Sequence, residues 1–275
     1  MRITMNDGVR LAVEVAGSGP GLLLVHGLGG AKEDFADHVP ALARDHTVVI
    51  FDHRGHGESD NPPEAASYSF ARLVEDTIAV ADATGLEHFR LLGHSMGGMV
   101  ARRVALQESS RVEALVMMDT SAGPVPGFDP DLISIGVDVA LTQGKPALKE
   151  LLDWAGALDT PAYKRVVAKR PGYTDFEARK WAGMSEIMWG TLMHELANQT
   201  DDLPAMAASL RAPLLVLVGD QDTPFVLASN AIKEAIPSAQ LVLIPDAGHS
   251  PQFENSGAWI AALTGFLSAL PANAR

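Results

Sequence analysis

The stretch "LLGHSMGGMV", residues 91–100, places a serine between glycines directly after an apolar run. The apolar run has the pattern of a buried strand, and the residues from Gly97 onward have the pattern of a helix. Strand, Gly-x-Ser-x-Gly and helix in this order are typical of a strained turn that lifts a serine hydroxyl above a sheet. The helix start behind such a turn offers free N–H groups that stabilise negative charge. The segment therefore predicts a nucleophilic serine at Ser95.

The rest of the chain alternates short apolar runs with longer helical patterns, which predicts a mostly parallel, doubly wound α/β sheet. Buried-strand patterns lie at 21–27, 46–54, 89–95, 113–121, 213–220 and 240–248. Helical patterns lie at 33–43, 69–84, 97–109, 226–236 and 255–269. The run at 10–17 alternates in polarity, so we expect a half-buried antiparallel strand at an edge of the sheet.

One long segment has no strand-like run. From Gly127 to Leu210, helical patterns rich in tryptophan and methionine are interrupted by prolines. The segment follows the apolar run that ends near Thr120, at the carboxyl end of a strand, where open α/β sheets bind ligands. We therefore expect a core formed by 1–126 and 211–275, with residues 127–210 inserted as a helical cap.

The composition limits the classes of partner. The formal net charge of -13, from 34 acidic and 21 basic residues, repels nucleic acid and anionic membrane surfaces. The chain has no cysteine, which excludes disulfides, thiolate nucleophiles and cysteine-ligated metals. It has no signal-peptide pattern and no apolar run near the roughly 20 residues that span a bilayer. We expect a cytoplasmic protein, monomeric or homo-oligomeric, that acts on a small molecule without a metal or cofactor.

A serine nucleophile needs a base and an orienting carboxylate, which follow it in the order acid, then histidine. Only His194 and His249 lie after Ser95 in the sequence. His249 follows an apolar strand pattern in a glycine-containing loop, where it can reach the serine. His194 lies in a helical segment, with no second histidine to complete a zinc motif. His249 is therefore the predicted base.

The carboxylate has several candidates. Asp222 stands three residues after Gly219, beyond the end of a strand pattern, and is the first choice. Asp119 ends the preceding strand pattern and is an alternative at the same edge of the sheet. Asp220 is a second alternative, although it can instead bond local backbone amides. Asp246 is better explained as a loop carboxylate.

The negative oxygen that forms when the serine attacks a carbonyl needs two hydrogen-bond donors. One is the backbone N–H of Met96, directly after the serine. The other is expected from "HGLGG", residues 26–30, where Gly27 lets the chain turn and the Leu28 N–H is the candidate donor. His26 fits a structural role in this loop.

Five motifs in this order resemble the α/β-hydrolase fold superfamily: "HGLGG", "FDHRGHGES", "GHSMGG", "VGDQD" and "AGHSPQFEN". The resemblance covers nearly the whole chain outside the inserted segment, which corresponds to the family's variable cap. Within the superfamily the chain is similar to small serine esterases, enol-lactonases and cofactor-free perhydrolases. The resemblance implies a catalytic triad of Ser95, Asp222 and His249, with oxyanion donors at Leu28 and Met96.

The second motif carries the remaining histidines of interest. In "FDHRGHGES" the positions that match a structural motif of the family are Asp52, Arg54, Gly55 and Ser59. His53 and His56 are spaced like metal ligands, but this match favours a structural loop.

The expected reaction is hydrolysis of a small, fairly apolar carboxylic ester or lactone through an acyl-enzyme. Phe128, Trp154 and Trp189 are the candidates to line its pocket. The same triad serves carbon–carbon bond hydrolases and perhydrolases, and a non-catalytic ligand receptor on this fold is a further alternative. A serine at position 95 disfavours epoxide hydrolases and haloalkane dehalogenases, which need a carboxylate nucleophile.

Overall fold

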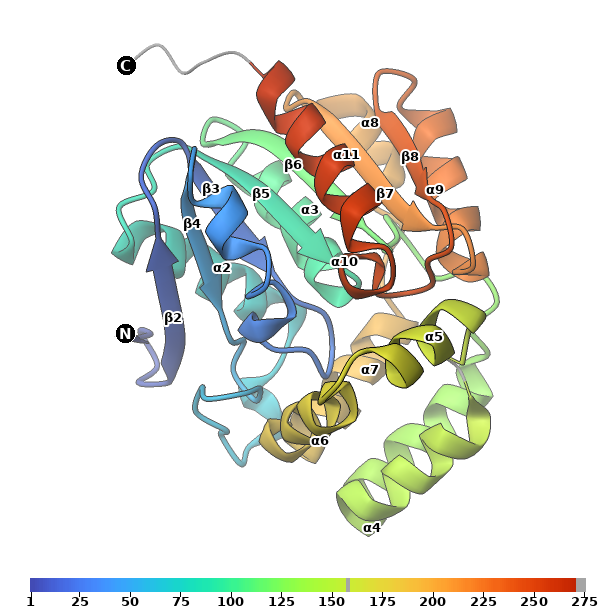
Figure 1. Ribbon diagram of the computed structural model, residues 1–275. Helices are drawn as coiled ribbons and strands as arrows, with labels where there is room; N and C mark the ends of the chain where they lie inside the picture. Colours follow the sequence, from blue (N-terminus) through green and yellow to red (C-terminus); the bar gives the residue numbers. More distant parts are fainter. Residues whose placement is uncertain (157–158, 271–275) are drawn as a thin grey trace.

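An eight-stranded sheet with helices on both faces forms the body of the protein in the computed structural model, which describes residues 1–156 and 159–270 (Figure 1). The strands are β1 (Arg2–Thr4), β2 (Arg10–Ala16), β3 (Gly21–Val25), β4 (Thr47–Phe51), β5 (Phe89–His94), β6 (Val112–Met118), β7 (Leu214–Gly219) and β8 (Gln240–Ile244). Their order is β1-β2-β4-β3-β5-β6-β7-β8. β2 pairs antiparallel with β1 and β4, and the other neighbours are parallel.

The helices fall into a group around the sheet and a group inserted between β6 and β7. Around the sheet lie η1 (Lys32–Asp34), α1 (Val39–Leu42), η2 (Ala65–Ser67), α2 (Phe70–Ala83), α3 (Met96–Gln107), α9 (Thr223–Ala235), α10 (Pro251–Glu254) and α11 (Ser256–Ala269). Inserted are α4 (Pro130–Ala155), α5 (Pro161–Lys169), α6 (Tyr173–Gly183), α7 (Glu186–Ala197) and α8 (Leu203–Ser209). The predicted α/β sheet with a helical insertion is therefore confirmed. Among the described residues, no helix has the length and apolar character to cross a membrane.

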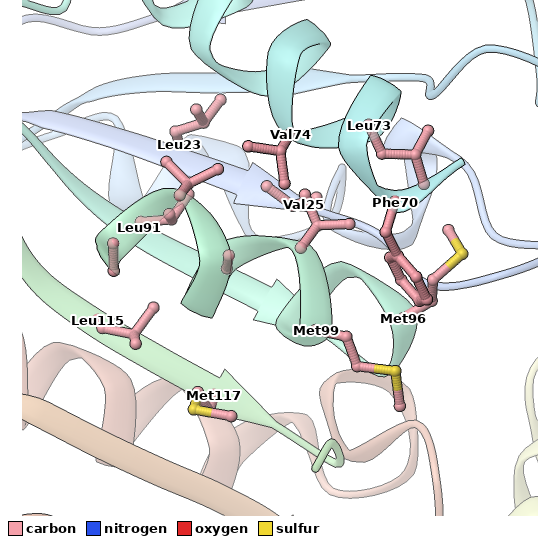
Figure 2. Packing of buried hydrophobic residues seen from close by; sticks show 14 of the residues in the cluster. Leu23, Val25, Phe70, Leu73, Val74, Leu91, Met96, Met99, Leu115 and Met117 are labelled. Carbon is pink, nitrogen blue, oxygen red and sulfur yellow. The ribbon is translucent and has the colours of Figure 1, made fainter. Parts of the chain in front are cut away.

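Alternate residues of the central strands face two separate cores. Leu23 and Val25 of β3 pack into the core under α2 and α3, whereas Leu22 and Leu24 face the core that includes α11. Figure 2 shows side chains of β3 and β6 packed against those of α2 and α3. Each fully buried side chain of this size contributes about 1.5–3 kcal/mol to stability. The double burial explains why these strands form nearly continuous apolar runs in the sequence.

Three local predictions are wrong. The strand at 10–17 is not the edge, because the three-residue β1, too short to leave a pattern, pairs outside it. The run at 240–248 is not buried on both faces, because β8 forms the other edge of the sheet and Leu243 is 48% exposed. The helix expected at 33–43 is split into η1 and α1, since Pro40 cannot donate a backbone hydrogen bond one turn back.

A buried arginine joins the two ends of the inserted segment to the helix behind the serine. Arg102 of α3 is fully buried and donates to the carbonyl oxygen of Ala122 at 2.5 Å and to Oε1 of Gln199 at 2.7 Å. Its guanidinium also lies 2.9 Å from the carboxylate of Asp202, whose own N–H donates to Ala122 O. The point where the chain leaves the sheet is thus held beside the point where it returns. Helices α4 to α7 occupy the end of the molecule at the carboxyl ends of the strands, whereas α8 lies towards the opposite end, beside α9 (Figure 1).

Candidate active site

Ser95 forms the whole turn between β5 and α3. Its backbone has φ 53° and ψ -122°, a conformation that costs a residue with a side chain about 1–3 kcal/mol. The neighbouring chain is very close: a Cβ added at Gly93 would lie 2.2 Å from the carbonyl oxygen of Gly97. The Met96 side chain is fully buried in the core and anchors the start of α3 (Figure 2). The strained turn predicted from the sequence is therefore present at Ser95.

The histidine and the aspartate form a direct pair. Nδ1 of His249, in the loop after β8, lies 2.6 Å from Oδ2 of Asp222, in the loop between β7 and α9. The Asp222 side chain is 9% exposed and that of His249 17% exposed, so water screens their contact only weakly. When Nδ1–H donates to the carboxylate, Nε2 of a neutral ring is left as an acceptor. A histidine in this tautomer can take a proton from a hydroxyl.

His94 links the serine to this pair. Its Nε2–H donates to the carbonyl oxygen of His249 at 2.6 Å, and the two ring centroids lie 5.0 Å apart. Burial lowers the pKa of His94 to about 3, so its ring is neutral. Because Ser95 is the next residue in the chain, this contact brings the serine turn and the His249 loop to one site. This role of His94 was not predicted from the sequence, although the residue lies inside the "GHSMGG" motif.

A buried glutamate holds the backbone on both sides of His249. Oε2 of Glu254 accepts the N–H of Gly248 at 2.6 Å and that of Ser250 at 3.2 Å. Burial raises the pKa of this carboxyl above its usual range. Glu254 was not predicted from the sequence either. It lies five residues after His249, and the sequence does not indicate that its carboxyl accepts backbone N–H groups on both sides of that histidine.

The other carboxylates considered from the sequence lie in different surroundings. Asp220 is exposed, and its Oδ1 accepts the N–H of Ala247 at 3.2 Å. A bond to a backbone amide is the alternative to a catalytic role that the sequence suggested for Asp220. Asp246 is exposed in the loop before His249. Asp119 is fully buried close to both Asp222 and His249. Asp222 is thus the carboxylate in hydrogen-bond contact with the histidine.

The loop after β3 packs directly on the serine. A Cβ added at Gly27 would lie 2.9 Å from Cβ of Ser95. Throughout residues 1–156 and 159–270, neither the Leu28 N–H nor the Met96 N–H has an acceptor. The Gly29 N–H donates to Nε2 of a buried histidine at 3.1 Å, which fixes the loop from behind. Two unbonded N–H groups on segments that flank the serine are the requirement for an oxyanion hole.

The cap also contacts this loop. Sδ of Met184 lies 3.6 Å from the position of a Cβ on Gly29. Lys180 of α6 lies 2.9 Å from Oδ1 of Asp34, whose Oδ2 accepts the N–H of Ala31 at 3.2 Å. The end of α6 therefore lies over the loop that carries the Leu28 N–H.

Three buried histidines support the same loop. Nε2 of His56 accepts the Gly29 N–H, and Nε2 of His26 accepts the His53 N–H at 3.0 Å. Burial lowers the pKa of all three rings, most strongly for His53 and His56. Because two of the ring nitrogens already accept backbone N–H groups, these histidines are structural. Among residues 1–156 and 159–270, neither nitrogen of the His53 ring has a hydrogen-bond partner.

We expect the His53→Phe variant to lose less stability in acid than the natural protein. The unfolded chain takes up a proton at His53 near pH 6.5, whereas the folded chain, with its lowered pKa, does not. Stability is therefore highest above that pH and falls as the pH decreases towards the lowered pKa. Between pH 7 and pH 5 the unfolding free energy, measured by urea denaturation, should fall less in the variant than in the natural protein, by a difference of up to about 2 kcal/mol. His88→Phe, at an exposed site, is the control; an equal loss in His53→Phe and the natural protein contradicts the prediction.

The predicted pocket residues lie in three different settings. Phe128 packs against Phe225, with ring centroids 6.3 Å apart. Phe225, which was not predicted from the sequence, in turn lies over His249 with ring centroids 5.0 Å apart. Trp189 is 6% exposed and belongs to the core that continues into the cap. Trp154 is 83% exposed, so its ring does not fit the prediction of an enclosed pocket.

A parallel sheet, a strained serine at a helix start and a buried histidine–aspartate pair are features of hydrolases built on an α/β sheet. Residues 20–256 match the profile of the alpha/beta hydrolase fold family. The chain therefore belongs to this family, as the motif resemblance implied.

Several relatives of the chain carry the names of hydrolases. A protein of Pseudomonas savastanoi pv. phaseolicola (strain 1448A / Race 6), provisionally named carbamate hydrolase RutD, is 30% identical over 257 residues, covering 91% of this chain and 94% of its own. A solved hydrolase from Pseudomonas aeruginosa PA01 is 29% identical with a TM-score of 0.83, covering 98% of both chains. Est816, described as an N-acyl homoserine lactone degrading enzyme, is 26% identical with a TM-score of 0.78, covering 97% of this chain and 100% of its own.

Proposed function

We propose that this protein is a serine hydrolase that cleaves a carboxylic ester or lactone of a small, fairly apolar substrate through an acyl-enzyme on Ser95. The observation that carries the proposal is the His249–Asp222 contact of 2.6 Å beside a serine held in a strained turn. An unassisted serine hydroxyl is a weak nucleophile, so a base oriented by a carboxylate is what this site needs for acyl transfer.

The proposed reaction has two halves. His249 Nε2 accepts the Ser95 proton while Oγ forms a bond to the substrate carbonyl carbon, and the Leu28 and Met96 N–H groups bind the oxyanion. The imidazolium then protonates the leaving alkoxide as the acyl–oxygen bond breaks. In the second half His249 removes a proton from water, which attacks the acyl carbon, and Ser95 leaves with the proton returned. Asp222 holds the ring tautomer and stabilises its positive charge in both halves.

The side chains around the site favour an apolar substrate. Phe225 and Phe128 extend from His249, and Met184 approaches the oxyanion loop from the cap. Lys180, in the cap helix over the oxyanion loop, is paired with Asp34. Aromatic and thioether groups with few free charges suit an aliphatic or aromatic acyl group better than a sugar or a phosphate. The name of Est816 supports the lactone half of this proposal.

Steady-state rates on one substrate panel test the proposal. The panel contains p-nitrophenyl acetate and butyrate, aliphatic and aromatic lactones, a vinylogous diketone and an N-carbamoyl compound. We expect turnover of esters and lactones, with butyrate at least as good as acetate, and labelling of Ser95 by a fluorophosphonate.

Three outcomes would contradict the proposal in different ways. Diketone cleavage with inert esters and lactones would indicate a carbon–carbon bond hydrolase. Carbamate cleavage alone would indicate the chemistry named for RutD. One-time acylation of Ser95 without product release would indicate a receptor on this fold.

A further inference from the structure

Asp119 is held in an unfavourable conformation next to the histidine–aspartate pair. It follows β6 directly, has φ 44° and is fully buried. Within the described chain, the other residues with a side chain and positive φ are Ser95 and Asp246, at the carboxyl ends of β5 and β8. Such strain costs about 1–3 kcal/mol and persists where the surrounding structure demands it. Ser95 and Asp119 thus share this strain at the carboxyl ends of the neighbouring strands β5 and β6.

One oxygen of Asp119 is bonded and the other is not. Oδ1 accepts the N–H of Gly219 at 2.9 Å, and the Asp119 N–H itself donates to the carbonyl oxygen of Leu217 at 2.9 Å. Oδ2 is inaccessible to water, and no N–H or O–H of the described residues donates to it. One ligand-type atom each from Asp119, Asp222 and His249 lies within 4.8 Å of the others. The unbonded oxygen thus has a carboxylate and an imidazole as polar neighbours.

Two carboxyl groups this close in a buried site do not both ionise. Asp222 is the carboxylate in contact with the histidine. Burial, together with the charge of Asp222, raises the pKa of Asp119 well above its usual range, and the nearby Glu254 acts in the same direction. A neutral Asp119 would carry a proton that it can donate to Asp222.

We propose that Asp119 is a positioning residue for the proposed reaction: its neutral carboxyl donates a hydrogen bond to the Asp222 carboxylate and orients it towards His249 Nδ1. This accounts for a buried, strained acid whose second oxygen lacks a donor. It also distinguishes Asp119 from an alternative base-orienting carboxylate, because a neutral acid adds no charge to the histidine. The proposal rests on the proposed function only for its kinetic test.

The Asp119→Asn and Asp119→Leu variants separate these roles. An asparagine amide can accept the Gly219 N–H with its oxygen and donate to Asp222 with its NH₂, so it replaces the neutral acid in both contacts. A leucine has a similar size and can do neither. We expect Asp119→Asn to keep kcat for p-nitrophenyl acetate within about threefold. We expect Asp119→Leu to lower kcat about 10- to 100-fold with little change in KM. Losses of this size are typical when a residue that orients a metal ligand is removed, and Asp119 is proposed to orient Asp222 in the same way.

A spectroscopic measurement makes the test independent of turnover. The proton shared by His249 Nδ1 and Asp222 gives a low-field proton NMR resonance, which should persist in Asp119→Asn and shift or broaden in Asp119→Leu. If the natural protein hydrolyses no ester, the proposed function fails, and this resonance still decides the role of Asp119. If Asp119→Leu does not fold, Asp119→Asn decides alone. A loss of more than a hundredfold in kcat, or of the resonance, in a folded Asp119→Asn protein overturns the proposal.

Discussion

Replacing Ser95 with alanine is expected to lower kcat for p-nitrophenyl ester hydrolysis by a factor of about 10⁴ or more. The hydroxyl is the nucleophile in the proposed mechanism, and the remaining groups can only bind the substrate and polarise its carbonyl. Alanine suffers the same backbone strain at φ 53° as serine, so the fold should tolerate the change. We expect the unfolding free energy to remain within about 1 kcal/mol of that of the natural protein.

A second serine provides the matched control. Ser229 in α9 is fully buried, and its Oγ has no hydrogen-bond partner in the part of the chain that the structure describes. Ser229→Ala therefore removes a buried hydroxyl away from the site. Activity and fluorophosphonate labelling should be unchanged in Ser229→Ala and absent in Ser95→Ala. Full ester hydrolysis by a correctly folded Ser95→Ala protein would show that another group carries the chemistry.

The features that were predicted from the sequence are those with a local cause. The turn at Ser95 could be predicted because a strained strand-to-helix turn needs small neighbours, and glycines stand at the required positions. His249 could be predicted by elimination, because only two histidines follow the serine and one lies in a helix. The structure places His249 against Asp222. Their catalytic roles stay predictions until the variants are measured.

The features that were not predicted depend on contacts between distant segments. Phe225 reaches His249 because α9 begins directly after Asp222 and turns its first aromatic ring towards the neighbouring loop. Trp154 looked like a pocket residue because large apolar side chains are usually buried, yet it lies near the end of α4 with its ring 83% exposed. No periodicity in a single sequence indicates which side of a cap helix faces the sheet.

The raised pKa of Asp119 was also not predicted from the sequence. From the sequence alone an aspartate at the end of a strand pattern is expected to be charged. Asp119 was therefore considered as an alternative to Asp222 for orienting the histidine. Its raised pKa follows from complete burial and from the charge on Asp222, neither of which is visible before the strands are assembled. The sequence thus predicted which residues gather at this edge, and tertiary structure decides which of them are charged.

A single methyl group at Gly97 is expected to disrupt both the fold and the site. A Cβ on Gly97 would lie 2.3 Å from the carbonyl oxygen of Val25 and 2.5 Å from that of His26. Both atoms belong to backbone at the end of β3, which is fixed between two parallel neighbours, so neither can move without separating β3 from β5. We expect Gly97→Ala to lose about 3 kcal/mol or more of unfolding free energy, at the upper end of the cost of overpacking a core.

The same displacement would also reach the oxyanion loop, because His26 leads into Gly27 and Leu28. We therefore expect kcat to fall at least about 100-fold in any Gly97→Ala protein that folds, since small shifts of positioned groups have effects of that size. Gly265→Ala is the matched control: Gly265 is exposed in α11, and outside its own helix no described residue lies within 4 Å of an added Cβ. That variant should gain about 0.5–1 kcal/mol from helix propensity and keep full activity. Urea denaturation and ester hydrolysis are measured on both variants. A Gly97→Ala protein as stable and active as Gly265→Ala would show that the turn does not require the close approach of Gly97 to the carbonyl oxygens of Val25 and His26.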